Sequence, residues 1–121
     1  MKKQEKIKQK LKNREEVNLM KNDKIKRVEE MENIMDKSAD IFMELNMVLD
    51  KLEENLTDYK KLDEYYSSKN WFLDVEDFNN GVLPQDLKCG VLSEDGAYNL
   101  FGENHELAIR MVEIAAKMLR R

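Results

Sequence analysis

Glycine and proline, which break helices and build tight turns, are scarce in this sequence. The 121 residues include four Gly and one Pro, and all five lie between residues 81 and 102. A sandwich or barrel of many strands needs turn residues at each hairpin, so this composition argues against such folds. Because the first 80 residues contain neither helix breaker, we predict an all-α fold.

Cysteine and histidine are almost absent, which excludes several classes of site. One Cys and one His do not suffice for a disulfide scaffold, a cysteine-rich zinc site or most pairs of nucleophile and base. Cys89 has no second Cys to pair with, and the Glu that a di-iron bundle places three residues before a His is Gly102 here, before His105. We therefore assign no catalytic residue, no metal site and no cofactor, and predict that the protein is not an enzyme.

Long apolar runs are also missing. The longest, such as 41–43 and 47–49, have three residues, whereas a membrane-spanning helix needs about 20. No apolar stretch of signal-peptide length follows the Lys-rich start. With one unpaired Cys, these absences predict a cytoplasmic protein that does not enter a membrane.

Charge is distributed unevenly along the chain. Residues 1–27 hold eleven Lys/Arg and four Asp/Glu, whereas residues 28–121 hold ten and twenty-one. A basic arm of this kind can neutralise nucleic-acid phosphates, but the acidic remainder and the lack of aromatics among the lysines make nucleic acid an unlikely partner. Alternatively, the arm is simply a solvated helix.

A third interpretation treats residues 1–19 as a basic extension produced by a misassigned start. Codons for Arg14 to Val17 can spell a purine-rich ribosome-binding sequence shortly before the codon of Met20. On this hypothesis residues 20–121 form a single helical domain, which the gene sequence would decide.

A heptad pattern of apolar residues begins at Val28. Nine of its ten core positions are apolar, Ser38 being the exception, and a third adjacent position widens the stripe beyond that of a two-stranded coiled coil. The pattern predicts one helix over about residues 24–65, roughly 60 Å long. The three positions are occupied by Val28, Met35, Phe42, Leu49 and Leu56; by Met31, Ser38, Leu45, Leu52 and Tyr59; and by Ile34, Ile41, Val48 and Leu62.

The later elements are predicted from caps and breakers. Ser67 or Ser68 can cap a short helix over about 69–79. This helix lies in an aromatic elbow, whose rings are those of Tyr65, Tyr66, Trp71, Phe72 and Phe78. Pro84 begins a single turn over 84–89. Ser93, followed by two acidic residues, begins a helix over about 94–120. This last helix carries two apolar stripes and is expected to pack back on the long helix.

A helix of 26 residues covers about 39 Å of a neighbour that is roughly 60 Å long. Because a long exposed apolar stripe is a liability, we predict that a homodimer or a partner helix covers its N-terminal part. The candidate interaction surface is this stripe or the segment 83–100. Its residues are Val28, Met31, Met35, Ile41, Phe42, Leu83, Asp86 and Lys88.

Several motifs in the second half resemble a small bacterial family, the DUF4298 domain of unknown function. They are the run from Leu83 to Lys88, the run from Gly90 to Asp95, Tyr98-Asn99-Leu100 and the run from Glu106 to Met111. The resemblance extends from about residue 24 to 119 and implies a small, cytoplasmic, helical bacterial protein. It implies no activity, substrate or catalytic residue.

The leading hypothesis is a non-enzymatic module for self-association or protein–protein interaction. An alternative is a small-ligand binder or enzyme that uses carboxylates near the aromatic elbow, which a deep pocket lined by converging polar groups would favour. Weak nucleic-acid binding through the basic arm is the third. The residues of the alternative site are Asp74, Asp77, Asp86, Glu94 and Asp95, with Arg110.

Overall fold

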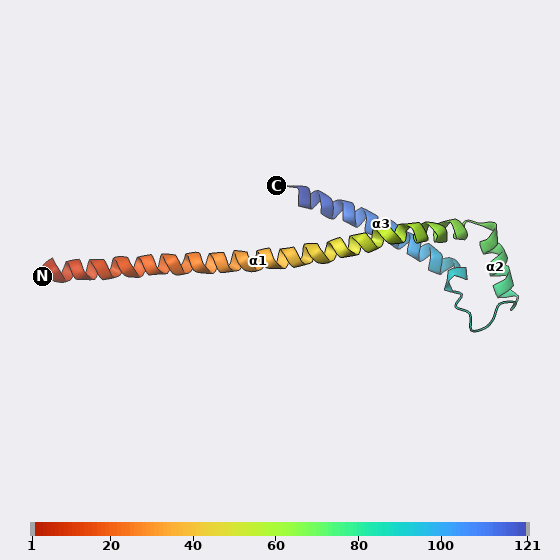
Figure 1. The fold of residues 1–121 in the computed structure, drawn as a ribbon, viewed down its shortest axis with the longest axis horizontal. Coiled ribbons are helices and arrows are strands. Elements are labelled where there is room, and N and C mark those ends of the chain that lie inside the picture. Colours follow the sequence, from red (N-terminus) through yellow and green to blue (C-terminus); the bar gives the residue numbers. More distant parts are fainter. Residues whose placement is uncertain (1, 121) are drawn as a thin grey trace. The chain divides into compact units, whose positions relative to one another are not determined.

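The structure, a computed structural model, describes residues 2–120. Within these residues, three α-helices and one short 3₁₀ helix follow one another in the order α1, α2, η1 and α3 (Figure 1). The described residues contain no strand, and the all-α prediction is confirmed.

Helix α1 runs from Lys2 to Tyr66. It therefore begins more than 20 residues before the expected start at residue 24. The predicted start followed the apolar pattern, but residues 2–23 contain neither Gly nor Pro and are rich in Lys, Glu and Gln, which are good helix formers. The helix ends at Tyr66, close to the predicted residue 65.

The chain divides into two compact units, residues 1–54 and residues 55–121. The described part of the first unit is a single helix, the greater part of α1. None of the residues of α1 is buried, because one helix has no second element against which to bury its apolar side. The first unit therefore has no core of its own.

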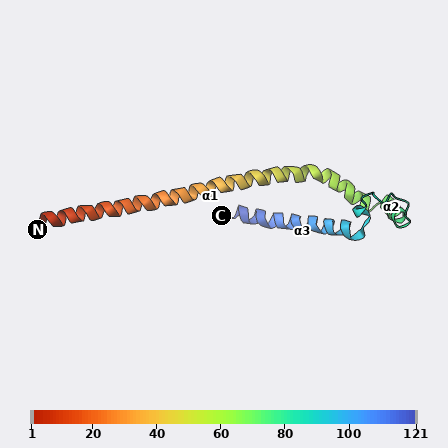
Figure 2. The same cartoon turned by 90° about the horizontal axis from the view of Figure 1, so that it is seen from below.

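In the second unit, a tight turn leads from α1 into α2 (Lys69–Asn79). Of the two predicted caps, Ser68 is the N-cap: its hydroxyl accepts a hydrogen bond from the Trp71 backbone N–H at 3.3 Å and donates one to the Tyr65 carbonyl at 2.6 Å. Gly81 follows α2 with φ +72°, a left-handed conformation that favours glycine. Beyond it, a loop leads toward α3 (Figure 2).

The loop contains the expected turn, although a shorter one than 84–89. The Leu87 N–H donates to the Pro84 carbonyl at 3.2 Å, and the helical piece is instead η1 (Gly90–Leu92), which was not predicted. Helix α3 (Glu94–Leu119) begins as predicted, with the Ser93 hydroxyl accepting from the Gly96 N–H at 3.3 Å. A Cβ at Gly96 would lie 3.0 Å from the Gly90 carbonyl oxygen, so glycine permits this close approach of α3 to η1.

The core of the second unit is small and aromatic. Trp71, Leu92 and Ala97, one each from α2, η1 and α3, are the buried hydrophobic residues among those described. The Trp71 indole N–H donates to the Val91 carbonyl at 3.0 Å. The Phe101 ring of α3 meets the rings of Tyr59 and Tyr66 edge-on, with centroids 5.8 and 5.3 Å apart. The predicted packing of the last helix along the long one is limited to these ring contacts at the end of α1. The large apolar side chains farther along α3, from Leu107 to Leu119, are exposed.

Candidate functional site

The apolar stripe of α1 is exposed along the first unit. The side chains predicted to meet a partner there are each half exposed or more: Val28 58%, Met31 52%, Met35 58%, Ile41 50% and Phe42 59%. We call this surface, which continues through Leu45, Leu49 and Leu52, the α1 stripe. A continuous row of exposed large apolar residues on a helix is characteristic of an interaction surface.

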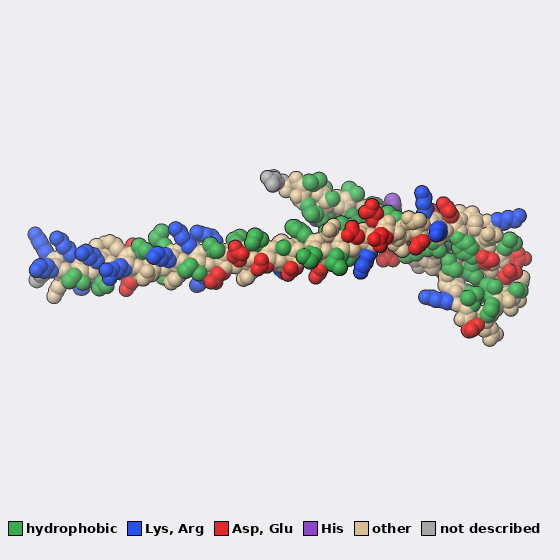
Figure 3. Space-filling view, in the orientation of Figure 1, with side chains coloured by type: hydrophobic (Ala, Val, Ile, Leu, Met, Phe, Trp, Pro, Cys, Tyr) green, Lys and Arg blue, Asp and Glu red, His purple; other side chains and the backbone are tan. Residues whose placement is uncertain are grey.

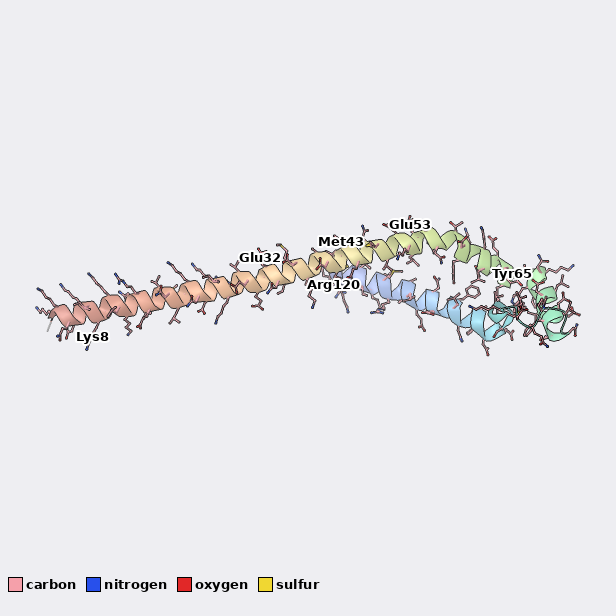
Figure 4. The ribbon with its side chains drawn as sticks, turned by 60° about the horizontal axis from the view of Figure 1, so that its bottom comes forward. Lys8, Glu32, Met43, Glu53, Tyr65 and Arg120 are labelled. Atoms are coloured by element: carbon pink, nitrogen blue, oxygen red, sulfur yellow. The ribbon has the colours of Figure 1, made fainter. Side chains whose placement is uncertain are left out.

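The charges of α1 are divided between its two ends. Residues 2–27 carry eleven Lys/Arg against four Asp/Glu, a balance of +7, and residues 28–66 carry four against twelve, a balance of −8. Figure 3 shows the basic side chains gathered on the N-terminal part of α1 and acidic ones farther along. Lys8 lies in the basic part, and Glu32 and Glu53 lie in the acidic part (Figure 4). One helix thus carries an apolar stripe and two segments of opposite charge.

The predicted interaction residues of the loop differ from one another in burial. Leu83 is partly buried, whereas Asp86 and Lys88 are exposed. Leu83 and Lys88 line an open hollow of about 280 Å³ at the elbow, together with Tyr65, Asp74, Leu87, Cys89, Val91 and Leu92. Asp86 does not line it. The structure therefore brings Leu83 and Lys88 together and leaves Asp86 apart.

The carboxylates of the alternative ligand site do not converge on this hollow. Of the five, Asp74 lines it, while Asp77, Asp86, Glu94 and Asp95 are exposed at the surface. Asp74 is engaged by Tyr65, whose hydroxyl donates to its Oδ2 at 2.6 Å. No group of three or more His, Cys, Asp and Glu placed to hold a metal ion occurs in residues 2–120. The arrangement offers one bonded carboxylate in a mainly apolar hollow.

The Tyr65 hydroxyl has a strongly shifted ionisation. The hydrogen bond to Asp74 is the largest cause, followed by desolvation, and together with the nearby negative charge they raise the pKa of Tyr65 to about 12. The bond joins the last turn of α1 to α2 and requires the neutral phenol. Its contribution to stability is therefore complete below about pH 10, the ordinary tyrosine pKa, and is lost as the pH rises from there through about 12.

We expect Tyr65→Phe to remove the last tyrosine to ionise in an alkaline titration followed by tyrosinate absorbance. The matched control is Tyr98→Phe, because Tyr98 is 72% exposed and makes no contact of this kind. The ionisation that is lost in Tyr65→Phe should persist in this variant. A Tyr65→Phe titration that loses a group ionising near pH 10 would show that the bond to Asp74 does not hold in solution.

The remaining candidate groups stand alone. Cys89 is partly buried and unpaired, and His105 is exposed on α3. His105 lines a second hollow, of about 530 Å³, with Tyr98, Asn99, Phe101, Gly102, Glu103 and Glu106. Neither group is bonded to a base or a carboxylate within the described chain in a way that would activate it.

Sequence reasoning missed the residues that hold the elbow together. The Trp71 indole bonds to a loop carbonyl 20 positions away, a pairing that no local pattern predicts. Leu92 and Ala97 are buried although neither is part of the heptad stripe. One feature of the sequence does indicate the burial of Leu92: it ends the short apolar run that precedes the Ser93 cap.

Within residues 2–120, no helix is both long enough and apolar enough to cross a membrane. The chain is thus an all-α protein with a single long helix, a small aromatic elbow and an exposed apolar stripe.

Comparison with known proteins extends this description. The sequence profile of the family described as domain of unknown function DUF4298 matches residues 28–114. The chain therefore belongs to the DUF4298 family, as the resemblance predicted. No curated protein matches the chain, and no solved structure matches it.

Proposed function

We propose that this protein is a non-enzymatic helical module that self-associates through the α1 stripe. The observation that carries the proposal is the exposure of the stripe on a helix with no buried residue. Large apolar residues in a heptad pattern are positioned to interdigitate with a second helix. The role follows from this surface, and we expect it to be exercised in the cytoplasm, where the lone Cys89 stays reduced.

The amount of exposed surface supports the same proposal. The chain exposes 11673 Å², whereas a folded monomer of 14.4 kDa exposes about 6,800 Å². A stable interface needs about 800 Å² from each partner. The excess is several times that area, so association has ample surface to remove from water.

The elbow supports a non-enzymatic role in a second way. Its one converging carboxylate, Asp74, already accepts the Tyr65 hydrogen bond, and the buried indole of Trp71 fills the space between α2 and η1. An enzyme built on paired carboxylates needs two of them on one substrate. The exposed positions of Asp77 and Asp86 do not provide that pair.

Sedimentation equilibrium of the full chain tests the proposal directly. Between about 1 µM and about 100 µM, a range that spans the affinities of ordinary self-associating proteins, we expect the mass to rise to that of a dimer. The dimer should also protect the backbone amides of residues 28–52 from hydrogen exchange. A monomer mass at every concentration, with those amides unprotected, would contradict self-association.

A further inference from the structure

We infer that the α1 stripe is occupied by the α1 stripe of a second copy, running antiparallel, with the pairing centred on Asp40. The inference rests on the proposed function and adds the identity, direction and register of the partner. Three observations carry it: where the free stripe ends, how its residues pair, and how charge is divided along α1.

The free part of the stripe ends before Tyr59. The Tyr59 ring is partly buried and meets Phe101 of α3 at 5.8 Å, so α3 already covers this core position. Leu56, which is 49% exposed, is the last free core position before Tyr59. The part of the stripe that lies within the first unit, residues 1–54, runs from Val28 to Leu52. Its midpoint is Asp40, whose side chain points away from the seam, the line along which the two helices would pack.

An antiparallel pairing about this midpoint matches core positions throughout. Val28 faces Leu52 of the other copy, and Met35 faces Leu45. Ser38, the one polar core residue, faces Phe42, so its small side chain lies opposite the largest one. At the centre, the Ala39 side chains of the two copies lie beside each other on one flank of the seam. The two Ile41 side chains lie beside each other on the other flank, so neither flank brings charges together.

The two registers that differ from this one by a single heptad make less favourable contacts. A shift of one heptad toward the C-terminus requires Tyr59, which Phe101 covers, and places Glu32 of one copy beside Glu53 of the other on the same flank. A shift of one heptad the other way removes Leu49 and Leu52 from the seam and shortens it. The register about Asp40 uses every core position from Val28 to Leu52 without facing like charges.

The division of charge selects the antiparallel direction. In a parallel pair the two +7 segments of residues 2–27 lie side by side, as do the two −8 segments of residues 28–66. Paired helix axes are about 8–10 Å apart, close to one Debye length at physiological salt, so this repulsion is only partly screened. In the antiparallel pair, residues 28–52 of the two copies still lie side by side, but residues 14–27 of each copy lie along residues 53–66 of the other, so the two +7 segments are kept apart. The run from Lys24 to Arg27 comes level with the run from Glu53 to Leu56.

Disulfide trapping tests the direction and the register. All variants carry Cys89→Ser, which removes the native thiol. The double variant Met31→Cys with Leu49→Cys is expected to form a covalent dimer on oxidation, because residue 31 of one copy faces residue 49 of the other. Met31→Cys alone and Leu49→Cys alone are the matched controls, in which the two thiols lie about 27 Å apart along the antiparallel pair.

A spin label outside the seam gives an independent measurement if cysteine in the seam weakens association. Asn22→Cys, also with Cys89→Ser, places one label on the outer face of α1 in each copy. In the antiparallel pair the two labels are about 54 Å apart along the axis, whereas in a parallel pair they lie side by side within about 20 Å. Pulsed electron paramagnetic resonance distinguishes these distances.

The outcomes separate the inference from the proposed function. A covalent dimer from the double variant, with the single variants uncrosslinked and a long label distance, supports the antiparallel pair. Rapid crosslinking of Met31→Cys alone with a short label distance overturns the inference and leaves self-association standing. A monomer mass for both the wild type and Cys89→Ser overturns self-association and the antiparallel pair together. A dimer that shows neither the crosslink nor the long label distance overturns the antiparallel pair and leaves self-association standing.

Discussion

The variant Phe42→Glu is expected to sediment as a monomer at concentrations at which the wild-type chain is a dimer. Phe42 is 59% exposed on the α1 stripe, and in the proposed dimer it packs near the centre of the seam. A carboxylate there loses the apolar contact and must be removed from water without a partner. Because the substitution occurs in both copies, we expect a loss of about 3–6 kcal/mol, or a dissociation constant about 100-fold to 20,000-fold higher.

The matched control for this prediction is Met43→Glu. Met43 is the next residue along the same helix, is 66% exposed, and lies about 100° farther around α1, away from the stripe. The substitution introduces the same charge and the same side chain. Its dissociation constant should stay within about threefold of the wild type. Equal weakening by both variants would mean that added charge, and not the stripe, governs association.

Trp71→Ala is expected to destabilise the elbow by about 3–5 kcal/mol, the usual cost of removing a buried Trp side chain. Trp71 is 7% exposed, its indole bonds to the Val91 carbonyl, and its ring meets those of Tyr66 and Phe72 with centroids 5.0 and 5.2 Å apart. Its loss leaves a cavity between α2 and η1 that the two remaining buried residues, Leu92 and Ala97, are too few to close. Hydrogen exchange measured by mass spectrometry should show amide protection in α2 and the first turns of α3 falling by two orders of magnitude or more.

Two further variants separate the contributions at this position. Trp71→Phe keeps an aromatic ring but leaves the Val91 carbonyl without its donor, so we expect a smaller loss of about 1–2 kcal/mol. Phe72→Ala is the neighbouring control, because Phe72 is 64% exposed. We expect its effect to stay below about 1 kcal/mol. If Phe72→Ala costs as much as Trp71→Ala, the core does not lie where the structure places it.

Local signals in the sequence predicted the helices well. Ser68 and Ser93 are the caps of α2 and α3, and both helices begin within one residue of their predicted starts, because capping is decided by a few neighbouring residues. The start of α1 was predicted too late because the apolar pattern begins at Val28, whereas helix formation needs only good helix formers without a breaker. A heptad pattern locates a packing surface and not the end of a helix.

The candidate site was predictable only in part. The α1 stripe followed from the spacing of Val28, Met31 and Met35, since periodicity along one helix determines which side chains share a face. The elbow did not follow, because the Trp71 contact with Val91 joins positions 20 residues apart. The carboxylates were grouped by their proximity in sequence, and Asp74 alone lines the hollow. Asp77 is exposed although it lies on the same helix, and the other three lie at exposed positions of the loop and of the first turn of α3.

Because residues 2–54 form a single helix, the rate at which proteases cleave this segment should depend on the concentration of the protein. A helix with no buried residue opens to the solvent at little cost, and proteases cleave opened backbone. If a second copy binds only the helical form, each tenfold rise in free protein above the dissociation constant lowers the opened fraction about tenfold. Newly made chains at low concentration are then the most readily degraded. On the proposed self-association, the concentration of the protein determines how fast it is degraded, with a threshold at the concentration at which the proposed pair forms.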